Sequence, residues 1–180
     1  MIEGSKVRLR AVERQDLAQF VEWLNNPEVR ENLALYTPLS MTAEEEWYGL
    51  MMKNPVEEHP LAIEVKGNNR WKLVGNTSFI HYDTHNRNAE IGIFIGDEKY
   101  WGKGYGAMAV RLMLRYGFNN LNLNRIYLQV FETNPRAIKC YEKVGFVLEG
   151  KARQSRFLNG KYIDVLLMSV LKEEWKDVEI

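Results

Sequence analysis

An apolar strand that leads through a glycine-rich loop into an amphipathic helix is the feature that most constrains the fold of this chain. Residues 89–95, AEIGIFI, are almost continuously apolar at their end, which is typical of a strand covered on both faces. The loop EKYWGKGYGA follows at 98–107. Beyond it, apolar residues recur at every third or fourth position and predict a helix of about four turns: Ala107, Val110, Leu114, Phe118 and Leu121. The loop is therefore expected between a central strand and a helix N-terminus.

The glycines of this loop predict a binding site for phosphate. Gly102, Gly104 and Gly106 fall within five positions, with Lys103 between the first two. Glycine permits positive φ and close approach of the backbone to a ligand, so successive N–H groups can point into one concavity. The unpaired N–H groups and the positive dipole end of the following helix favour an anion at the same place.

Hydrophobic periodicity predicts the remaining elements. Alternation favours a strand at 7–12, and helical spacing favours a helix at 16–24. Thr42 and Glu45 have the spacing of a capping box, which predicts a second helix running toward Lys53. Further strands are expected at 61–66, 73–81, 125–131, from 146 onward and at 161–171, and a further helix at 136–144.

Two short connections have the chemistry of hairpin turns, Gly67-Asn68-Asn69 and Asn159-Gly160. No repeat, low-complexity tract or linker divides the chain. The order of elements predicts a single domain over residues 1–180, of the α/β (mixed α+β) class.

Composition restricts the compartment and the partners. The opening MIEGSKVRLR lacks the apolar core of a signal peptide, and no apolar run approaches the roughly 18 residues of a membrane span. The single cysteine, Cys140, excludes an internal disulfide. No basic run is interleaved with aromatic residues, as nucleic-acid binding would favour. We expect a cytoplasmic protein, a monomer or homodimer, without nucleic-acid or membrane partners.

Charge is unevenly distributed although the net charge is zero. Residues 1–60 carry 11 acidic and 6 basic side chains, a net of −5, so the remainder carries +5. This asymmetry favours an anionic ligand on the C-terminal part and a cationic one near the N-terminal part. Glu44, Glu45 and Glu46 are candidates to steer a cationic amine, although at helical spacing only one or two can face the same way. Trp47 and Tyr48 are candidates to line an acceptor groove.

A dinucleotide site is the alternative interpretation of the loop. Residues 102–107 fit Gly-x-Gly-x-x-Ala, and Glu132 ends the next expected strand, where an acid that binds ribose is found in such folds. Against this, residues 96–101 separate the strand from the glycines, and Glu132 lies 30 residues after Gly102 instead of about 20. A dinucleotide-binding oxidoreductase therefore stays an alternative, whereas a Walker A sequence is absent.

The segment 90–146 resembles the GNAT N-acetyltransferases. Their acetyl-CoA signature, Gln/Arg-x-x-Gly-x-Gly/Ala opening a helix, is matched at Gly104 and Gly106, with Trp101 at the Gln/Arg position. A second family signature, Asn-x-x-Ala-x-x-x-Tyr-x-x-x-Gly-Phe, is matched in NPRAIKCYEKVGF by Asn134, Ala137, Tyr141, Gly145 and Phe146. The whole chain is most similar to the branch of ribosomal-protein N-terminal acetyltransferases, and residues 116–168 also resemble bacterial spermidine N-acetyltransferases.

The resemblance implies a central, mixed, mostly antiparallel sheet with flanking helices and a splayed fourth strand. It implies transfer of an acetyl group from acetyl-CoA, the cosubstrate, to a primary amine by direct attack in a ternary complex. The acceptor stays open among a protein N-terminal α-amine, a polyamine and an amino sugar. The resemblance places these residues at the cofactor: Ile93, Phe94, Ile95, Trp101, Gly102, Lys103, Gly104, Tyr105, Gly106, Asn134 and Ala137.

Two side chains are the catalytic candidates. By resemblance, the Tyr141 phenol is the general acid that protonates the departing sulfur, while one backbone N–H between Ile93 and Ile95 polarises the thioester carbonyl. Glu90, a carboxylate in an otherwise apolar strand, is the candidate general base, directly or through water. A solvent-facing carboxylate or one paired with an arginine is the alternative interpretation of Glu90.

Other reactive residues are expected to have no catalytic role. His81, Asp83 and His85 lack the further ligands of a metal site, so no metal is predicted. Cys140 has no histidine partner nearby, which argues against an acyl-enzyme. A non-catalytic CoA-binding module remains a third alternative.

Overall fold

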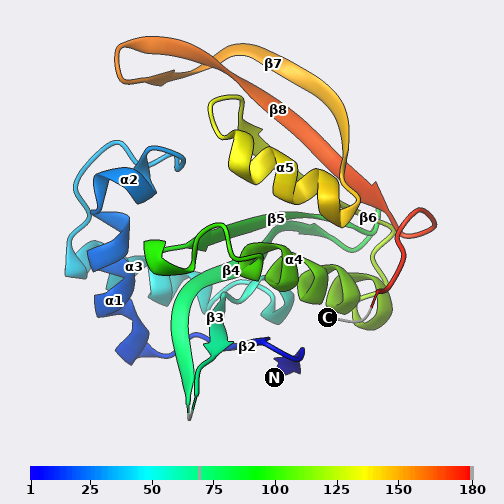
Figure 1. The fold of residues 1–180 in the computed structure, drawn as a ribbon, viewed down its shortest axis with the longest axis horizontal. Helices are drawn as coiled ribbons and strands as arrows, with labels where there is room; N and C mark the ends of the chain where they lie inside the picture. The colour runs from blue at the N-terminus through cyan, green and yellow to red at the C-terminus, as the bar shows by residue number, and fades with distance from the viewer. Residues whose placement is uncertain (69, 179–180) are drawn as a thin grey trace.

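The computed structural model describes residues 1–68 and 70–178. The strands of these residues form one eight-stranded sheet in the order β1-β2-β3-β4-β5-β6-β8-β7 (Figure 1). Their bounds are β1 Ile2–Glu3, β2 Val7–Ala11, β3 Leu61–Lys66, β4 Trp71–Asp83, β5 Asn88–Ile95, β6 Arg125–Phe131, β7 Val147–Leu158 and β8 Lys161–Leu171. The strand with the near-continuous apolar run, β5, is therefore central, as its sequence predicts.

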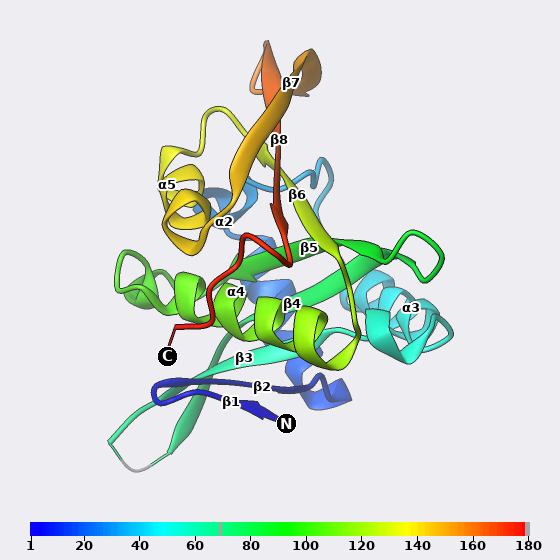
Figure 2. The ribbon, with the colours of Figure 1, turned by 90° about the vertical axis from the view of Figure 1, so that its right-hand side faces the viewer.

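The sheet opens between β5 and β6. All neighbouring strands pair antiparallel except β5 and β6, which run parallel. That parallel ladder has three register pairs and ends at Glu90 opposite Tyr127, although β5 stays paired with β4 as far as Ile95. In Figures 1 and 2, β6 and the long β7–β8 hairpin turn away from β5. The end of β5 thus has one unpaired edge, which is the splay predicted from the family resemblance.

Helices cover both faces of the sheet. They are α1 Leu17–Leu24, α2 Pro27–Arg30, α3 Met41–Met51, α4 Tyr105–Arg115, which continues in a π-helical turn η4 Tyr116–Asn120, and α5 Pro135–Val144. Three short 3₁₀ turns are η1 Arg14–Asp16, η2 Val56–Glu58 and η3 Glu98–Tyr100. None of these helices is both long and apolar enough to span a membrane.

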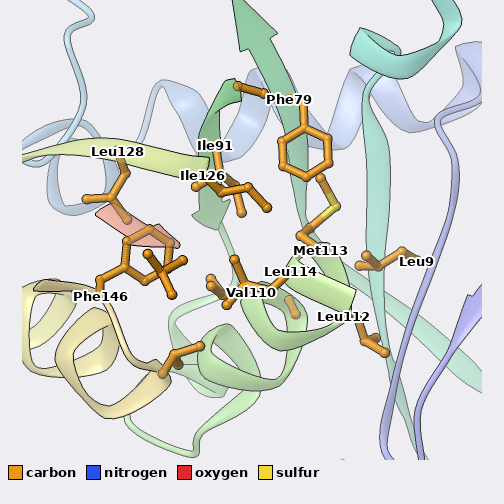
Figure 3. Close-up of a cluster of buried hydrophobic side chains, with 14 of the residues drawn as sticks. Leu9, Phe79, Ile91, Val110, Leu112, Met113, Leu114, Ile126, Leu128 and Phe146 are labelled. Atoms are coloured by element: carbon orange, nitrogen blue, oxygen red, sulfur yellow. The ribbon is translucent and has the colours of Figure 1, made fainter. Parts of the chain in front are cut away.

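The core lies mainly between α4 and the sheet. Val110, Met113 and Leu114 of α4 pack with Phe79 and Ile126 from the strands, and all five are at most 1% exposed (Figure 3). A second cluster on α1, centred on Phe20 and Trp23, packs with half-buried Tyr48 of α3 and Phe94 of β5. Burial of such side chains contributes roughly 1.5–3 kcal/mol each, so both faces anchor β5.

The predicted fold class is confirmed, and the element boundaries agree closely except near the second helix. That helix begins at Met41, and Ser40 is its N-cap, accepting a hydrogen bond from the Ala43 N–H at 3.1 Å. The capping box of Thr42 and Glu45 is therefore wrong, because Thr42 already lies inside the helix. The short helix α2 was not predicted. The expected turn Gly67-Asn68-Asn69 includes Asn69, which lies outside the described residues.

Candidate active site

The glycine loop leaves free backbone N–H donors at the start of α4. Gly102 and Gly104 have positive φ angles of 70° and 84°, and Gly104 is the N-cap of the helix. Met108 is the first helical residue whose N–H reaches a carbonyl, that of Gly104 at 3.0 Å. The N–H groups of the preceding turn therefore point out of the helix end, where an anion is stabilised.

Gly106 lies inside α4 and has no positive φ, so of the two uses of glycine only close approach of the backbone to a ligand applies there. A Cβ added there would meet only the Cγ1 of Ile95, at 3.9 Å, an ordinary contact. A Cβ at Gly104 would meet nothing within 4 Å. Packing within the chain thus does not require glycine at position 106, and the open space suits a ligand that approaches the backbone closely.

Trp101 connects the loop to β5 and to α5. Its indole Nε1 donates a hydrogen bond to the Ile95 carbonyl oxygen at 2.6 Å. The guanidinium carbon of Arg136, in the first turn of α5, lies 3.9 Å from the centre of the Trp101 ring. Arg136, which sequence reasoning missed, therefore brings a positive charge to the loop position where the family has Gln or Arg and this chain has Trp101.

The unpaired edge of β5 presents alternate backbone amides to the splay. The N–H of Gly96 donates to Val74 at the end of the β4 ladder. Because N–H groups alternate between the two sides of a strand, those of Ile95 and Ile93 point away from β4. By the same alternation, Phe94 directs its N–H toward its β4 partner Asn76. Ile93 and Ile95, and not Phe94, thus offer free donors to a molecule lying in the splay.

Tyr141 lies on α5, the helix that follows β6 in the chain. Asn134 caps this helix by accepting a hydrogen bond from the Ala137 N–H at 3.1 Å, and Gly145 ends it with a φ of 107°. The Tyr141 ring packs at 5.8 Å from Phe146 and against the main core. Burial, and secondarily Cys140, raises the pKa of the Tyr141 phenol above its ordinary value, so the hydroxyl stays protonated.

Glu90 lies where the splay begins, at the last register pair of β5 with β6. It is 9% exposed, and its Oε1 accepts a hydrogen bond from Gln129 Nε2 at 3.2 Å. His81 Nε2 lies 3.9 Å from its Oε2. Glu90 is therefore not solvent-facing, and among residues 1–68 and 70–178 it has no arginine partner; its carboxylate lies between two polar side chains.

A cavity of about 570 Å³ lies between the α2 region and the tip of the β7–β8 hairpin. It is lined by Asn25, Pro27, Glu28, Arg30, Glu31, Leu35, Tyr36, Phe157, Leu158 and Asn159. Within the described residues, neither Glu28 nor Glu31 forms an ion pair. Carboxylates beside exposed aromatic rings can bind an organic cation, and sequence reasoning missed this site because its two walls are far apart in the chain.

Comparison with known proteins decides what this arrangement is. Residues 6–147 match the family described as the acetyltransferase (GNAT) domain. The chain belongs to the GNAT acetyltransferase family. It is an enzyme, an acetyl-CoA-dependent N-acetyltransferase that acts on a primary amine, and acetyl-CoA is its cosubstrate.

Relatives of this GNAT chain include two spermidine N(1)-acetyltransferases. That of Vibrio cholerae serotype O1 is 35% identical over 176 residues, which cover 96% of each chain. That of Escherichia coli K12 is 30% identical over 180 residues, covering 97% of this chain and 91% of the relative. The putative ribosomal N-acetyltransferase YdaF of Bacillus subtilis is 38% identical over 104 residues, 58% of this chain and 56% of the relative.

A solved structure is also similar over nearly its whole length. The crystal structure of spermidine N-acetyltransferase from Vibrio cholerae in complex with CoA and spermine has a TM-score of 0.86 and 32% sequence identity. The match covers 95% of this GNAT chain and 98% of that chain.

The oxidoreductase alternative finds no support. Glu132, the residue considered for ribose binding, accepts a hydrogen bond from the Asp164 N–H at 2.9 Å and lies 3.8 Å from Lys151 Nζ. It is therefore engaged with the β7–β8 hairpin.

The other charged residues considered in the sequence analysis lie in different environments. Of the three α3 carboxylates, Glu44 is 4% exposed, whereas Glu45 and Glu46 are exposed. Asp83 accepts hydrogen bonds from the backbone and side chain of Asn86 at 2.8 and 2.7 Å. No group of three or more His, Cys, Asp or Glu side chains in the described part of the chain is placed to hold a metal ion.

Proposed function

We propose that this GNAT enzyme acetylates a primary amine of a linear polyamine of the spermidine type. The observation that carries the proposal is the cavity between α2 and the hairpin tip, where Glu28 and Glu31 lie with Tyr36 and Phe157. The similarity to two spermidine acetyltransferases over nearly the full chain supports the same acceptor class.

The charge of the cavity favours a flexible polycation over a neutral amine. Its two carboxylates exceed the single cation, Arg30, whose Nη2 donates to the Leu35 carbonyl at 3.1 Å. Phe157 and Tyr36, 54% and 62% exposed, offer ring faces to ammonium and methylene groups. A polyamine carries several ammonium groups, so one can be held here while another reaches the splay.

The loop and α5 hold the cosubstrate in this proposal. Backbone N–H groups from Gly102 to Gly106 bind the pyrophosphate, with Lys103 and Arg136 supplying positive charge. The splayed edge of β5 binds the amide groups of the pantetheine arm, in the manner of an added strand. The N–H of Ile93 or Ile95 then polarises the thioester carbonyl, a role worth roughly 2.7–4 kcal/mol in oxyanion holes.

Glu90 and Tyr141 divide the proton transfers. The buried Glu90 carboxylate takes a proton from the acceptor ammonium, which leaves a nucleophilic amine. The amine nitrogen attacks the thioester carbon, a C–N bond forms and the C–S bond breaks. The Tyr141 hydroxyl, kept neutral by burial, donates its proton to the departing sulfur, and the second proton of the attacking nitrogen restores that hydroxyl as the amide forms. Asn134 and Ala137 contribute by fixing the start of α5, the helix that carries Tyr141.

An acceptor panel tests the proposal. Release of free CoA thiol from acetyl-CoA is measured with spermidine, spermine, N-terminal peptides, amino sugars and aminoglycosides. We expect the largest kcat/KM for spermidine or spermine, and an increase in their KM, sensitive to salt, for Glu28→Gln and Glu31→Gln. Glu46→Gln is the matched control, because Glu46 is an exposed carboxylate away from the cavity lining. A preference for peptides, or equal effects of all three variants, contradicts the proposal.

A further inference from the structure

The Glu90 carboxylate is connected to solvent through one imidazole. Glu90 is 9% exposed, while the His81 side chain beside it is 73% exposed. The Gln129 amide holds the other carboxylate oxygen, Oε1, at 3.2 Å. The His81 ring therefore stands between Oε2 of a buried carboxylate and bulk water.

The backbone of β4 is distorted at the residue that brings this ring into place. The β4–β5 register shifts between Ile80 and Asp83, so that β4 has one more residue than β5 between the pairs Ile80↔Glu90 and Asp83↔Asn88. His81 lies in this bulge with a φ of 53°. Bulges re-aim side chains next to active sites, and a non-glycine residue in the left-handed region costs free energy that the surrounding structure must offset.

The reaction requires an outlet for a proton at this position. A primary amine enters as an ammonium, since alkyl amines have a pKa of about 10. One proton must leave it before attack, and a buried carboxylate that accepts the proton must release it before the next turnover. Of the two polar side chains on Glu90, the Gln129 amide cannot carry a proton onward, whereas an imidazole accepts at one nitrogen and releases at the other.

We infer that His81 is a positioning and relay residue that passes protons from Glu90 to solvent during amine acetylation. The inference rests on the proposed role of Glu90 as general base. The proton moves from the ammonium nitrogen to a Glu90 oxygen, then to His81 Nε2, while the proton on Nδ1 leaves to water. Only N–H and O–H bonds change. Because Nε2 and Oε2 are 3.9 Å apart, a small rotation of the ring or one bridging water completes the path.

Other ionisable groups lie near this path and can affect the pH dependence of the reaction. From β6, Tyr127 has its pKa raised by burial and then by Glu90, and the Arg125 guanidinium lies 4.9 Å from the Tyr127 ring centre. From η2, Glu58 accepts a hydrogen bond from the Tyr82 N–H at 2.7 Å. Burial, and secondarily the charge of Glu57, raises the pKa of Tyr82.

The test replaces the imidazole without changing the backbone requirement. Asparagine tolerates the left-handed region, so His81→Asn removes the imidazole and keeps the bulge. We expect kcat with spermidine to fall about 10- to 100-fold, less than the loss of a direct general base. We also expect an altered pH–rate profile, an unchanged KM for acetyl-CoA, and recovery of kcat when free imidazole is added. His85→Asn is the matched control, because His85 lies just after β4 in the turn that leads into β5, and it should behave as the wild type.

The outcomes separate this inference from the proposed function. If Glu90→Gln abolishes turnover while His81→Asn keeps the wild-type kcat and pH profile, Glu90 is the base and the relay is wrong. A fall in kcat that free imidazole does not restore, together with a lower Tm, makes His81 a bulge residue only and also overturns the relay. If Glu90→Gln itself keeps wild-type turnover, the general-base assignment fails.

Discussion

The Trp101 indole nitrogen lies 2.6 Å from the carbonyl oxygen of Ile95, so the glycine loop is hydrogen-bonded to the end of the splayed strand. Arg136 of α5 stacks on the same indole at 3.9 Å. One side chain thus connects the loop, the unpaired edge of β5 and the helix that carries Tyr141. The parts of the site that we propose to bind the cosubstrate are held relative to one another by this side chain.

Trp101→Phe tests that connection. The variant keeps a ring for Arg136 and removes the hydrogen bond to Ile95, which is worth about 0.5–1.5 kcal/mol. We expect the Kd for CoA to rise several-fold in calorimetric titration, with little change in the secondary structure by circular dichroism. Trp47→Phe, on α3, is the control and should bind CoA as the wild type does. If Trp101→Phe and the wild type bind CoA with equal affinity, CoA binding does not depend on the hydrogen bond between the loop and β5.

Gly106→Ala separates binding from stability. The new methyl group makes only an ordinary contact with Ile95, and alanine is a better helix former than glycine, so Tm should stay or rise. The same methyl group would displace a phosphate from the backbone. We expect the KM for acetyl-CoA to rise ~10-fold or more, the equivalent of one charged hydrogen bond.

The control for that variant is Gly49→Ala in α3, where a Cβ would meet nothing within 4 Å. It should stabilise the protein by roughly 0.5–1 kcal/mol in denaturant unfolding and leave both Michaelis constants unchanged. If Gly106→Ala behaves in the same way as Gly49→Ala, the phosphate does not approach the backbone at Gly106.

Tyr141→Phe removes a single hydroxyl from a packed ring. We expect kcat to fall by about 10²–10⁴-fold while CoA binding persists. Because burial raises the pKa of Tyr141, wild-type turnover should show no loss from its ionisation below the ordinary tyrosine value of about 10. Tyr162→Phe, at a 66% exposed position, is the control. Wild-type turnover of Tyr141→Phe would leave the ring with a packing role alone.

Glu44→Gln is expected to stabilise the enzyme in a pH-dependent manner. Burial raises the pKa of Glu44 to about 7, and its carboxyl makes no hydrogen bond or ion pair within the described residues. Between the ordinary glutamate pKa of 4.5 and about 7, the folded state therefore holds a proton that the unfolded state releases. Wild-type stability is lost as the pH rises through that window, and a neutral amide escapes the loss.

The measurement is Tm at several pH values. The Tm values of the variant and the wild type should agree near pH 4 and diverge up to pH 8. A difference of 1 kcal/mol in the free energy of unfolding shifts Tm by about 2–4 °C. Glu46→Gln, at an exposed α3 position, should show no such divergence. A constant difference in Tm across the pH range would mean that Glu44 does not titrate as its burial implies.

Local chemistry was sufficient to predict most of the fold. The period-two pattern of 125–131 corresponds to β6, and the Asn159-Gly160 turn has the two positive φ angles, 49° and 79°, that this dipeptide favours. The helix start at Ser40 was not predictable in this way. The Asn25 side chain bonds both the N–H and the carbonyl of Leu39, at 2.9 and 2.8 Å, and so fixes where the chain enters α3 from 14 residues away.

The missed parts of the site depend on contacts between distant segments. The acidic cavity exists because residues near Glu28 meet the hairpin tip at Phe157, and no local sequence pattern predicts that these segments meet. The stacking of Arg136 on Trp101 joins two motifs that were recognised separately. The position of His81 follows from a bulge, and alternation alone would predict a regular strand there.

The claim that this enzyme acetylates a polyamine is tested most directly by mass spectrometry. The purified enzyme is incubated with spermidine and with acetyl-CoA labelled in the acetyl group, and the polyamine is then analysed. We predict that one labelled acetyl group appears on spermidine for each free CoA thiol released, and that Tyr141→Phe slows both to the same extent. Release of CoA without acetylated spermidine, or no release at all while acetyl-CoA still binds, would contradict the claim.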